Sequence, residues 1–246
     1  MLAAPAGARW DPRPTTEPWQ IQFAGKLDLS VRAPVYDIDG ESNSARTVRA
    51  LHQRGRRAVC YFSAGTYEPY RSDSGRFPEA VLGKRLTGFP DERWLDVRRI
   101  DLLAPILRRR LDICARKGFD AADPDNVDGY ANDTGFALTA ADQLRFNRWV
   151  ARESHARGLA VGLKNDAAQV PALVRHFDFA VVEQCFQYRE CARYSPFVRR
   201  GKPVFGIEYE VPRRRFCGRS LRLGFSTVFK RLALGSFRRS CPRGAR

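Results

Sequence analysis

The sequence predicts a single-domain α/β protein, a (β/α)8 TIM-like barrel. Its 246 residues fall in the usual size range of such barrels. Short β-branched or aromatic runs alternate with longer helical patterns, and glycine repeatedly separates a helix from the buried strand that follows. A doubly wound open sheet would show the same alternation. The chain contains neither G-x-G-x-x-G nor a G-x-x-x-x-G-K-[ST] phosphate loop, so the barrel is preferred.

Nine segments have the character of strands, which is one more than a closed eight-stranded barrel uses. One of the nine must therefore lie outside the barrel. The predicted strands are residues 19–22, 35–38, 58–62, 94–97, 119–122, 160–163, 179–182, 204–207 and 225–229.

The predicted helices have recognisable faces and ends. Apolar residues at helical spacing predict one helix that ends before Gly118; these residues are Leu103, Leu107, Leu111 and Cys114. A capping box over Thr139 to Asp142 opens another helix, which runs to about Arg157 and is followed by Gly158. Gly55 and Gly201 end two further helices.

The barrel is expected to occupy residues 19–241. Residues 1–18 are expected to form an extended or disordered lead-in, and residues 242–246 a short tail. The first eight residues are rich in alanine but have no basic segment and no long apolar core, so a secretory leader is expected to be absent or truncated. No apolar run approaches the roughly 20 residues that cross a bilayer, so we expect no membrane partner.

The chain is strongly basic. It has 43 Lys and Arg against 27 Asp and Glu, a net charge of +16 and a pI near 10.2. Such a charge suits a nucleic acid, an anionic glycan or a membrane surface. The arginines are scattered over separate segments, however, and solvent-exposed helical arginine explains them, so no nucleic-acid partner is expected. A nucleic-acid binder would show affinity that falls steeply with salt.

The six cysteines indicate disulfides. None forms C-x-x-C, and the three histidines lie far apart, so a zinc site is not expected. An even number of cysteines fits an oxidising compartment. Cys185 and Cys191 lie six residues apart, Cys217 and Cys241 bracket the C-terminal segment, and all four are disulfide candidates. Cys60 and Cys114 form either a third bridge or two buried thiols.

Acidic residues follow almost every predicted strand. Because the C-terminal ends of barrel strands converge on one face, these residues predict an acidic mouth on a basic protein. They are Asp37, Asp39, Glu68, Asp96, Asp123, Asp125, Asp128, Asp166, Glu183, Glu208 and Glu210. Aromatic residues lie among them, and carboxylates combined with aromatic platforms are typical of enzymes that cleave sugars.

Other chemistries fit the pattern less well. Ser63 is not in a G-x-S-x-G turn and has no histidine near a strand end to act as its base. Asp37, Asp39 and Asp123 leave a calcium or magnesium site open as an alternative, although no metal or other cofactor is expected.

Several segments together resemble glycoside hydrolase family 114, the endo-α-1,4-polygalactosaminidases. They span nearly the whole chain from Trp19 to Cys241 and are specific only in combination. The segments are Trp19-Gln-Ile-Gln22, Val35-Tyr-Asp-Ile-Asp39, Cys60-Tyr-Phe-Ser-Ala-Gly65 with Tyr67-Glu68, Trp94-Leu-Asp-Val97, Gly118-Phe-Asp120, Pro124-Asp-Asn-Val-Asp-Gly-Tyr130, Gly162-Leu-Lys-Asn165, Phe177-Asp-Phe-Ala180, Glu183-Gln-Cys185 and Ile207-Glu-Tyr209.

The resemblance implies a TIM-like barrel in a secreted enzyme that cuts galactosamine-containing polymers internally. It implies Asp125 and Glu183 as the catalytic pair. The residues expected to line the sugar subsites are Asp37, Asp39, Tyr61, Glu68, Asp123, Asn126, Asp128, Lys164, Glu208 and Tyr209. Asp123 stands where members often carry glutamate, and Val182 where a polar residue is common, which indicates an altered substrate preference. We expect a monomer whose partner is a polysaccharide.

The positions of the two carboxylates agree with this resemblance. Asp125 and Glu183 follow the fifth and seventh predicted strands, so they can face each other across the barrel mouth. We favour Glu183 as the acid/base and Asp125 as the nucleophile, with Lys164 near the same rim. Deacetylated polygalactosamine is a polycation that a +16 protein repels at long range, so the acidic mouth must reverse this locally, or the substrate is N-acetylated or anionic. A non-catalytic polysaccharide-binding barrel is the alternative function.

Overall fold

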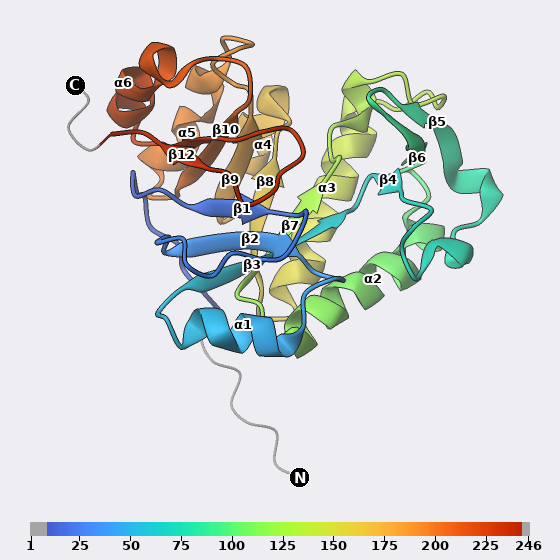
Figure 1. Cartoon of the computed structure of the whole chain (residues 1–246). Coiled ribbons are helices and arrows are strands. Elements are labelled where there is room, and N and C mark those ends of the chain that lie inside the picture. Colours follow the sequence, from blue (N-terminus) through green and yellow to red (C-terminus); the bar gives the residue numbers. More distant parts are fainter. Residues whose placement is uncertain (1–8, 243–246) are drawn as a thin grey trace.

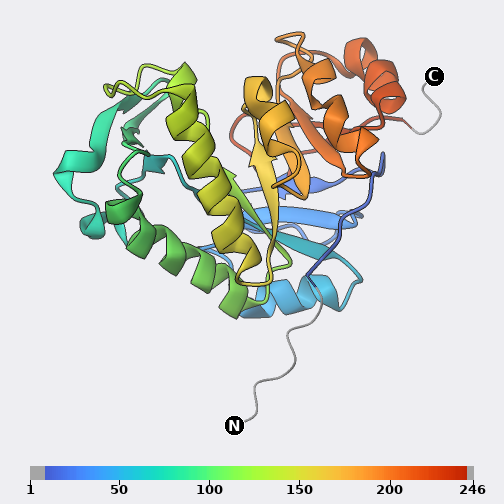
Figure 2. The same cartoon turned by 180° about the vertical axis from the view of Figure 1, so that it is seen from behind.

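The computed structural model describes residues 9–242 and has the predicted α/β architecture (Figures 1 and 2). A curled sheet carries the core, and its strands run in the order β1-β2-β3-β7-β8-β9-β10-β11-β12. All neighbouring strands are parallel except β11 and β12. The strands are β1 (Gln20–Gln22), β2 (Val35–Asp39), β3 (Arg57–Ser63), β7 (Ala121–Asp125), β8 (Ala160–Lys164), β9 (Phe179–Glu183), β10 (Val204–Glu208), β11 (Ser226–Phe229) and β12 (Arg239–Ser240).

Helices cover the outer side of the sheet (Figures 1 and 2). They are α1 (Ala45–His52), α2 (Ile100–Lys117), α3 (Ala140–His155), α4 (Val170–Leu173), α5 (Ser195–Arg199) and α6 (Arg213–Leu223). The predicted face of α2 is buried, and Gly118 ends this helix in the left-handed conformation at φ 85°. The Thr139–Asp142 capping box opens α3 as predicted.

The prediction that residues 94–97 form the fourth barrel strand was wrong. Those residues belong to the end of a separate antiparallel sheet that is inserted between β3 and α2. Its strands are β4 (Thr66–Tyr67), β5 (Leu82–Leu86) and β6 (Phe89–Leu95), in the order β4-β6-β5. A two-residue turn at Thr87 and Gly88, with φ 84° at the glycine, joins β5 to β6. Asp96 does not end a barrel strand and instead pairs with Arg98 at 2.8 Å.

The remaining eight predicted strands form the barrel wall. The wall is not closed by strand pairing alone. No strand ladder joins β11 or β12 to β1 in residues 9–242. The segment between β11 and β12 bridges this gap, because the backbone N–H of Phe23 donates to the carbonyl of Leu234 at 2.9 Å. Gln20 Nε2 also donates to the carbonyl of Ser236 at 3.3 Å.

The barrel contains its own core, separate from the layer between sheet and helices. Every second residue of each strand points inward, and at the N-terminal ends these residues are apolar. They include Ile21, Val35, Val59, Ala121, Ala160, Phe179 and Phe205. Phe179 and Phe205 are almost fully buried, and each large apolar side chain contributes about 1.5–3 kcal/mol to stability.

The predicted lead-in and tail are only partly described. Residues 9–18 form no helix or strand, and the ring of Trp10 packs against Phe179 with centroids 6.0 Å apart. The parts of these predictions that fall on residues 1–8 and 243–246 lie outside the described residues. Within residues 9–242, none of the helices is both long and apolar enough to cross a membrane.

Six cysteines form three disulfides. Cys185 is bonded to Cys191, and Cys217 to Cys241, as the spacing suggested. Cys60 of β3 is bonded to Cys114 of α2, which settles the pairing that the sequence left open. This third bridge ties the barrel wall to its covering helix.

Candidate active site

The inward-facing side chains change from apolar to polar along the barrel axis. Above the apolar layers, every second residue of each strand still points inward, but these inward-facing residues are polar or charged. Towards the C-terminal ends these residues are Asp37 and Asp39 on β2, Tyr61 on β3, Asp123 and Asp125 on β7, Lys164 on β8, Glu183 on β9 and Tyr209 after β10. Parallel pairing places Asp39 beside Tyr61 on β2 and β3, and Tyr61 beside Asp123 on β3 and β7. The predicted convergence of polar residues at one end of the barrel is therefore present.

Lys164 lies at the centre of this polar layer, between the two predicted catalytic carboxylates. Its Nζ is 3.3 Å from Asp125 Oδ1 and 3.6 Å from Glu183 Oε2. The Lys164 side chain is only 2% exposed, whereas those of Asp125 and Glu183 are 17% and 24% exposed. Burial alone would lower the pKa of Lys164, but the surrounding carboxylates outweigh it and raise this pKa well above its ordinary value.

Asp125 is held by donors on two elements. The Tyr61 hydroxyl donates to Asp125 Oδ2 at 3.0 Å, and the backbone N–H of Asn126 donates to Oδ1 at 2.7 Å. The ring of Tyr61 stacks on Phe23 with centroids 3.9 Å apart, which fixes the hydroxyl. A β-carbon on Gly65 would lie 1.7 Å from the carbonyl oxygen of Asn126, so only glycine lets this turn approach β7.

Glu183 has a matching set of contacts on the other side of Lys164. The Tyr209 hydroxyl donates to Glu183 Oε1. Asn165 accepts from the backbone N–H of Glu183 at 2.9 Å, and its Nδ2 lies 3.5 Å from Oε2. Both predicted catalytic carboxylates are thus bonded to a tyrosine hydroxyl that enters from a neighbouring strand.

Each of the three central strands ends in the same unusual backbone conformation. Asn126, Asn165 and Gln184 follow Asp125, Lys164 and Glu183, and their φ values are 60°, 49° and 56°. A left-handed residue other than glycine costs about 1 kcal/mol or more, and such strain concentrates at functional sites. Here it ends each strand abruptly, directly after the side chain that faces the groove.

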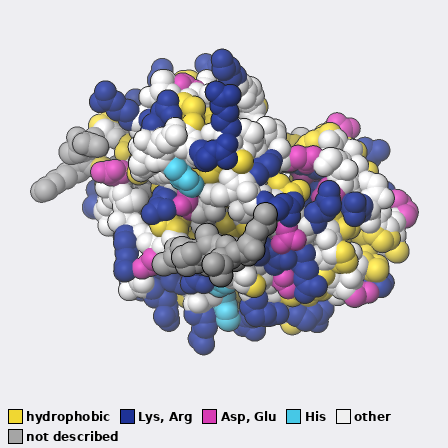
Figure 3. Space-filling model, turned by 90° about the horizontal axis from the view of Figure 1, so that it is seen from below, with side chains coloured by type: hydrophobic (Ala, Val, Ile, Leu, Met, Phe, Trp, Pro, Cys, Tyr) yellow, Lys and Arg dark blue, Asp and Glu magenta, His cyan; other side chains and the backbone are white. Residues whose placement is uncertain are grey.

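An open groove runs over these side chains. Among residues 9–242, six carboxylates and two cations line it, so the groove is acidic although the protein is basic. The acids are Asp39, Glu68, Glu92, Asp125, Asp128 and Glu183, and the cations are Arg71 and Lys164. Burial and the nearby Asp125 raise the pKa of Asp128 to about 6. Basic side chains are instead spread over the outside, and Figure 3 shows them on the face from which the N-terminus emerges.

One wall of the groove is an ion-pair network. Arg71 donates to Glu68 at 2.8 Å and also pairs with Asp39, whose Oδ1 accepts from the backbone N–H groups of Glu41 and Ser42. Burial opposes ionisation of Asp39, but Arg71 and Ser42 outweigh it and lower its pKa. The predicted residues Asp39 and Glu68 thus reach the groove in a fully paired state.

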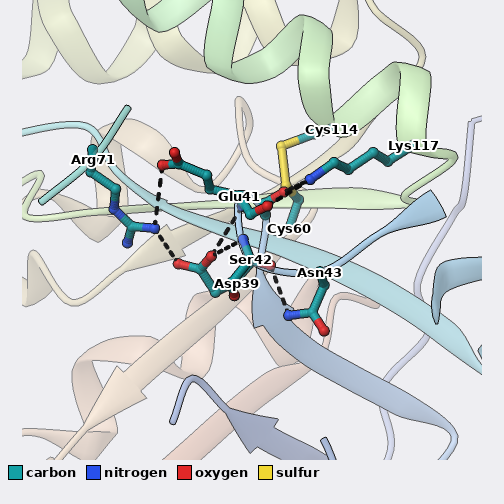
Figure 4. The surroundings of a disulfide bond; sticks show 9 residues. Asp39, Glu41, Ser42, Asn43, Cys60, Arg71, Cys114 and Lys117 are labelled. Carbon is teal, nitrogen blue, oxygen red and sulfur yellow. Dashed lines mark hydrogen bonds and ion pairs between the residues drawn. A yellow bond between two sulfur atoms is a disulfide. The ribbon is translucent and has the colours of Figure 1, made fainter. Parts of the chain in front are cut away.

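The Cys60–Cys114 disulfide packs against the turn that follows Asp39 (Figure 4). A β-carbon on Gly40 would come 2.3 Å from Cys60 Sγ, so the loop can pack on the disulfide only because it has glycine there. Lys117 Nζ donates to the carbonyls of Gly40 at 2.6 Å and Glu41 at 2.9 Å. The bridge therefore supports this wall of the groove.

Three residues predicted to contact sugar do not reach the groove. Glu208 is fully buried on the outer face of the sheet, because Ile207 and Tyr209 on either side of it point inward. Its Oε1 accepts from the backbone N–H of Phe186 at 2.8 Å, and burial raises its pKa to about 7. Asp37 and Asp123 point inward but have no exposed surface, so they lie beneath the groove.

The other residues predicted to contact sugar lie at the groove. Tyr61, Asn126, Asp128, Lys164 and Tyr209 all line the groove. Asp39 pairs with Arg71, which makes it a poor ligand for the alternative calcium or magnesium site. In the described part of the chain, no three His, Cys, Asp or Glu side chains are arranged to hold a metal.

Several groove residues escaped prediction. Asn165 lies within the quoted Gly162-Leu-Lys-Asn165 segment but was not assigned a role. Glu92 comes from β6 of the inserted sheet and Tyr70 from the turn after β4, and the Tyr70 hydroxyl lies 3.0 Å from Glu68 and 3.1 Å from Glu92. The signal in the sequence is Gly88, which indicates a hairpin turn and therefore a separate antiparallel sheet that forms part of the groove wall.

An acidic groove at the C-terminal end of a β/α barrel, with two facing carboxylates, is the arrangement of a glycoside hydrolase. The model of the glycoside hydrolase family GH114 matches residues 2–246, and the chain belongs to this family. A comparison with curated proteins gave no match.

Solved structures agree with this assignment. The chain is 39% identical to Ega3 from Aspergillus fumigatus, solved in complex with galactosamine, over 95% of this chain and 98% of that chain, with a TM-score of 0.90. The glycoside hydrolase domain of PelA from Pseudomonas aeruginosa is 16% identical over 91% of this chain and 98% of its own, with a TM-score of 0.72. An alpha-galactosidase from Thermus thermophilus is 13% identical over 88% and 59%, with a TM-score of 0.53. The last two likenesses concern the fold alone.

Proposed function

We propose that this protein hydrolyses α-1,4 linkages inside galactosamine-containing polysaccharides, with Asp125 and Glu183 as its catalytic carboxylates. The observation that carries the proposal is that these two partly exposed carboxylates approach a single buried ammonium group from either side in an open groove. The 39% identity to Ega3, a protein solved with galactosamine bound, supports the substrate class.

The spacing of the pair favours a double displacement. Because both carboxylates contact Lys164 Nζ, at 3.3 and 3.6 Å, the facing oxygens can be no further apart than these distances together. That limit accommodates the separation of about 5–5.5 Å between the carboxyl groups of retaining enzymes, and on this basis we infer retention rather than inversion, which uses about 6.5–9.5 Å.

We assign Asp125 as the nucleophile and Glu183 as the acid/base. Tyr61, the Asn126 N–H and Lys164 all stabilise negative charge on Asp125. In the first step Asp125 attacks the anomeric carbon while Glu183 gives its proton to the departing glycosidic oxygen. In the second step Glu183 takes a proton from water, which hydrolyses the glycosyl–Asp125 ester and regenerates both groups.

The charge of the groove favours substrates with free amines. Its carboxylates outnumber its cations, and a cleft focuses its own field even on a protein of net charge +16. An ammonium group at C2 of deacetylated galactosamine is attracted by that field. N-acetylation removes the charge, so we infer a preference for deacetylated units.

The shape of the groove supports internal cleavage. Tyr70, Phe89 and Leu232 are among the most exposed large apolar residues of the described chain, at 65%, 50% and 65%, and all three line the groove. They come from the turn after β4, from β6 and from the segment after β11, so the apolar surface extends beyond the catalytic pair. Aromatic faces in such positions can stack on additional sugar rings of a long chain.

The three disulfides indicate an oxidising compartment, and we infer that the enzyme acts outside the cell.

The test is hydrolysis of defined α-1,4 oligomers of galactosamine, N-acetylgalactosamine and mixed sequence, with the products sized by mass spectrometry. Internal fragments from deacetylated or mixed oligomers are the expected result. Binding without any product would identify a non-catalytic polysaccharide-binding barrel, and release of single terminal sugars would contradict internal cleavage.

A further inference from the structure

Two carboxyl groups beneath the groove have no role in the mechanism above. Asp37 on β2 and Asp123 on β7 both point into the barrel, and neither has any exposed surface. None of their four carboxylate oxygens has a hydrogen-bond partner when both groups are ionised. A buried ionised carboxylate without a donor is strongly unfavourable, so this pair requires an explanation.

The charges around the pair are unbalanced unless a proton is present. Lys164 Nζ lies 3.7 Å from Asp123 Oδ2, and it already faces Asp125 and Glu183. With Asp37 also ionised, a fourth negative charge would be buried next to Asp123 with only this ammonium to balance it. The hydroxyls of Tyr61 on β3 and Tyr209 after β10 also face this layer. Burial raises the pKa of both far enough that they stay neutral and add no charge.

We propose that Asp37 and Asp123 share one proton in a hydrogen bond between their carboxyl groups, and that this buried pair positions Lys164 between Asp125 and Glu183. Protonated Asp37 donates to Asp123, which gives each group one hydrogen bond. Asp123 remains the anion that holds the ammonium from below. Asp37 and Asp123 are thus positioning residues that act through Lys164 without touching the substrate.

The titration of the pair agrees with this geometry. Burial, followed by the nearby Asp123 carboxylate, raises the pKa of Asp37 well above its ordinary value. Burial raises the pKa of Asp123 to about 6, against the opposing effect of Lys164. The proton belongs mainly to Asp37 because Lys164 contacts Asp123 and favours its ionised form.

The pair makes stability depend on pH in a defined direction. Because the pKa of Asp37 is higher in the folded state than its ordinary 3.8, unfolding releases a proton in the range between the two values. The contribution to stability is therefore complete below about pH 4. It is lost progressively as the pH rises above this value and through the raised pKa of Asp37.

The proposal rests on the proposed function, and its test uses Asp37→Asn and Asp37→Leu, which have similar shapes. The Asn amide still donates to Asp123, whereas Leu cannot. Asp37→Asn should keep kcat within about threefold of wild type, and Asp37→Leu should lower kcat at least tenfold with KM changed less than twofold. Equal losses of kcat in the two variants would overturn the proposal.

A second measurement needs no substrate and so remains informative if the proposed function fails. The thermal midpoint of the wild type should fall relative to that of Asp37→Asn between pH 4 and pH 8, because the Asn side chain does not titrate. Parallel curves for the two proteins would contradict proton sharing. If Asp37→Leu does not fold, this comparison still decides the question.

Discussion

Two pairs of carboxylates lie along the barrel axis, one above the other. Asp125 and Glu183 line the groove and are 17% and 24% exposed, whereas Asp37 and Asp123 beneath them have no exposed surface. The upper pair accepts hydrogen bonds from tyrosine hydroxyls, and the lower pair has no donor except a shared proton. Carboxylates at the two depths of the barrel thus have different roles: the upper pair is placed for catalysis, and the lower pair positions Lys164, which lies between the two pairs.

The largest expected effect comes from removing charge in the upper layer. Asp125→Asn keeps the size of the side chain but removes the attacking carboxylate, so kcat should fall by about 10³-fold or more. Hydrolysis of polygalactosamine checks this, together with a thermal midpoint close to that of wild type. The matched control is Asp133→Asn, because Asp133 lies in an exposed pair with Lys84 away from the groove. Near-normal turnover in Asp125→Asn would contradict the catalytic role of the upper carboxylate pair.

Removing the cation between the layers should damage both activity and stability. Lys164→Met leaves the surrounding carboxylates uncompensated in a buried site, which should cost about 3 kcal/mol of stability at pH 7. We expect kcat to fall about 100-fold as the catalytic pair loses its alignment. Urea unfolding and kinetics measure the two effects. Lys84→Met, at an exposed ion pair, should change neither.

Removing a single donor to the upper pair should have a smaller effect. Tyr61→Phe keeps the ring that stacks on Phe23 but loses the hydroxyl that donates to Asp125. A hydrogen bond to a charged group is worth about 1.5–3 kcal/mol, so a reduction of kcat by at least tenfold is expected. Tyr36→Phe is the control, because the Tyr36 hydroxyl donates to Val31 on the outer side of the sheet. A similar loss of kcat in both variants would indicate general damage.

The smallest expected effect concerns the rim of the groove, away from both pairs. Tyr70→Ala removes an exposed ring from the turn after β4 and should raise KM for long chains about fivefold, equivalent to about 1 kcal/mol. KM for the shortest substrates should not change. Tyr188→Ala removes another exposed ring, 63% accessible, that does not line the groove. Equal changes in KM for the two variants would count against a sugar-binding role for Tyr70.

Much of the barrel could be predicted because its signals are local. Short β-branched or aromatic runs marked the parallel strands, and Gly118 and the Thr139–Asp142 capping box marked helix ends. The inserted sheet was missed because β5 and the first half of β6 are polar and largely exposed, so their pattern resembles a loop. One of its strands was consequently counted among the barrel strands. Predicting its position required knowledge of pairing with β4, which no local pattern provides.

The site could be predicted by position but not by depth. Residues after strands were expected to converge, and those of the β7, β8 and β9 ends do. Glu208 was misplaced because the period of two along β10, which turns it away from its neighbours Ile207 and Tyr209, was not applied. The depth of Asp37 and Asp123 depends on the register between strands and on the packing above them. Such long-range information cannot be read from the residues that follow a strand.

The most direct test compares one substitution at two neighbouring strand ends. Glu183 and Glu208 end β9 and β10, which pair in register, but only Glu183 faces the groove. Initial rates on polygalactosamine should fall by about 10³-fold in Glu183→Gln and stay within about threefold of wild type in Glu208→Gln. Comparable rates in the two variants, or a greater loss in Glu208→Gln, would contradict the assignment of catalysis to the groove carboxylates.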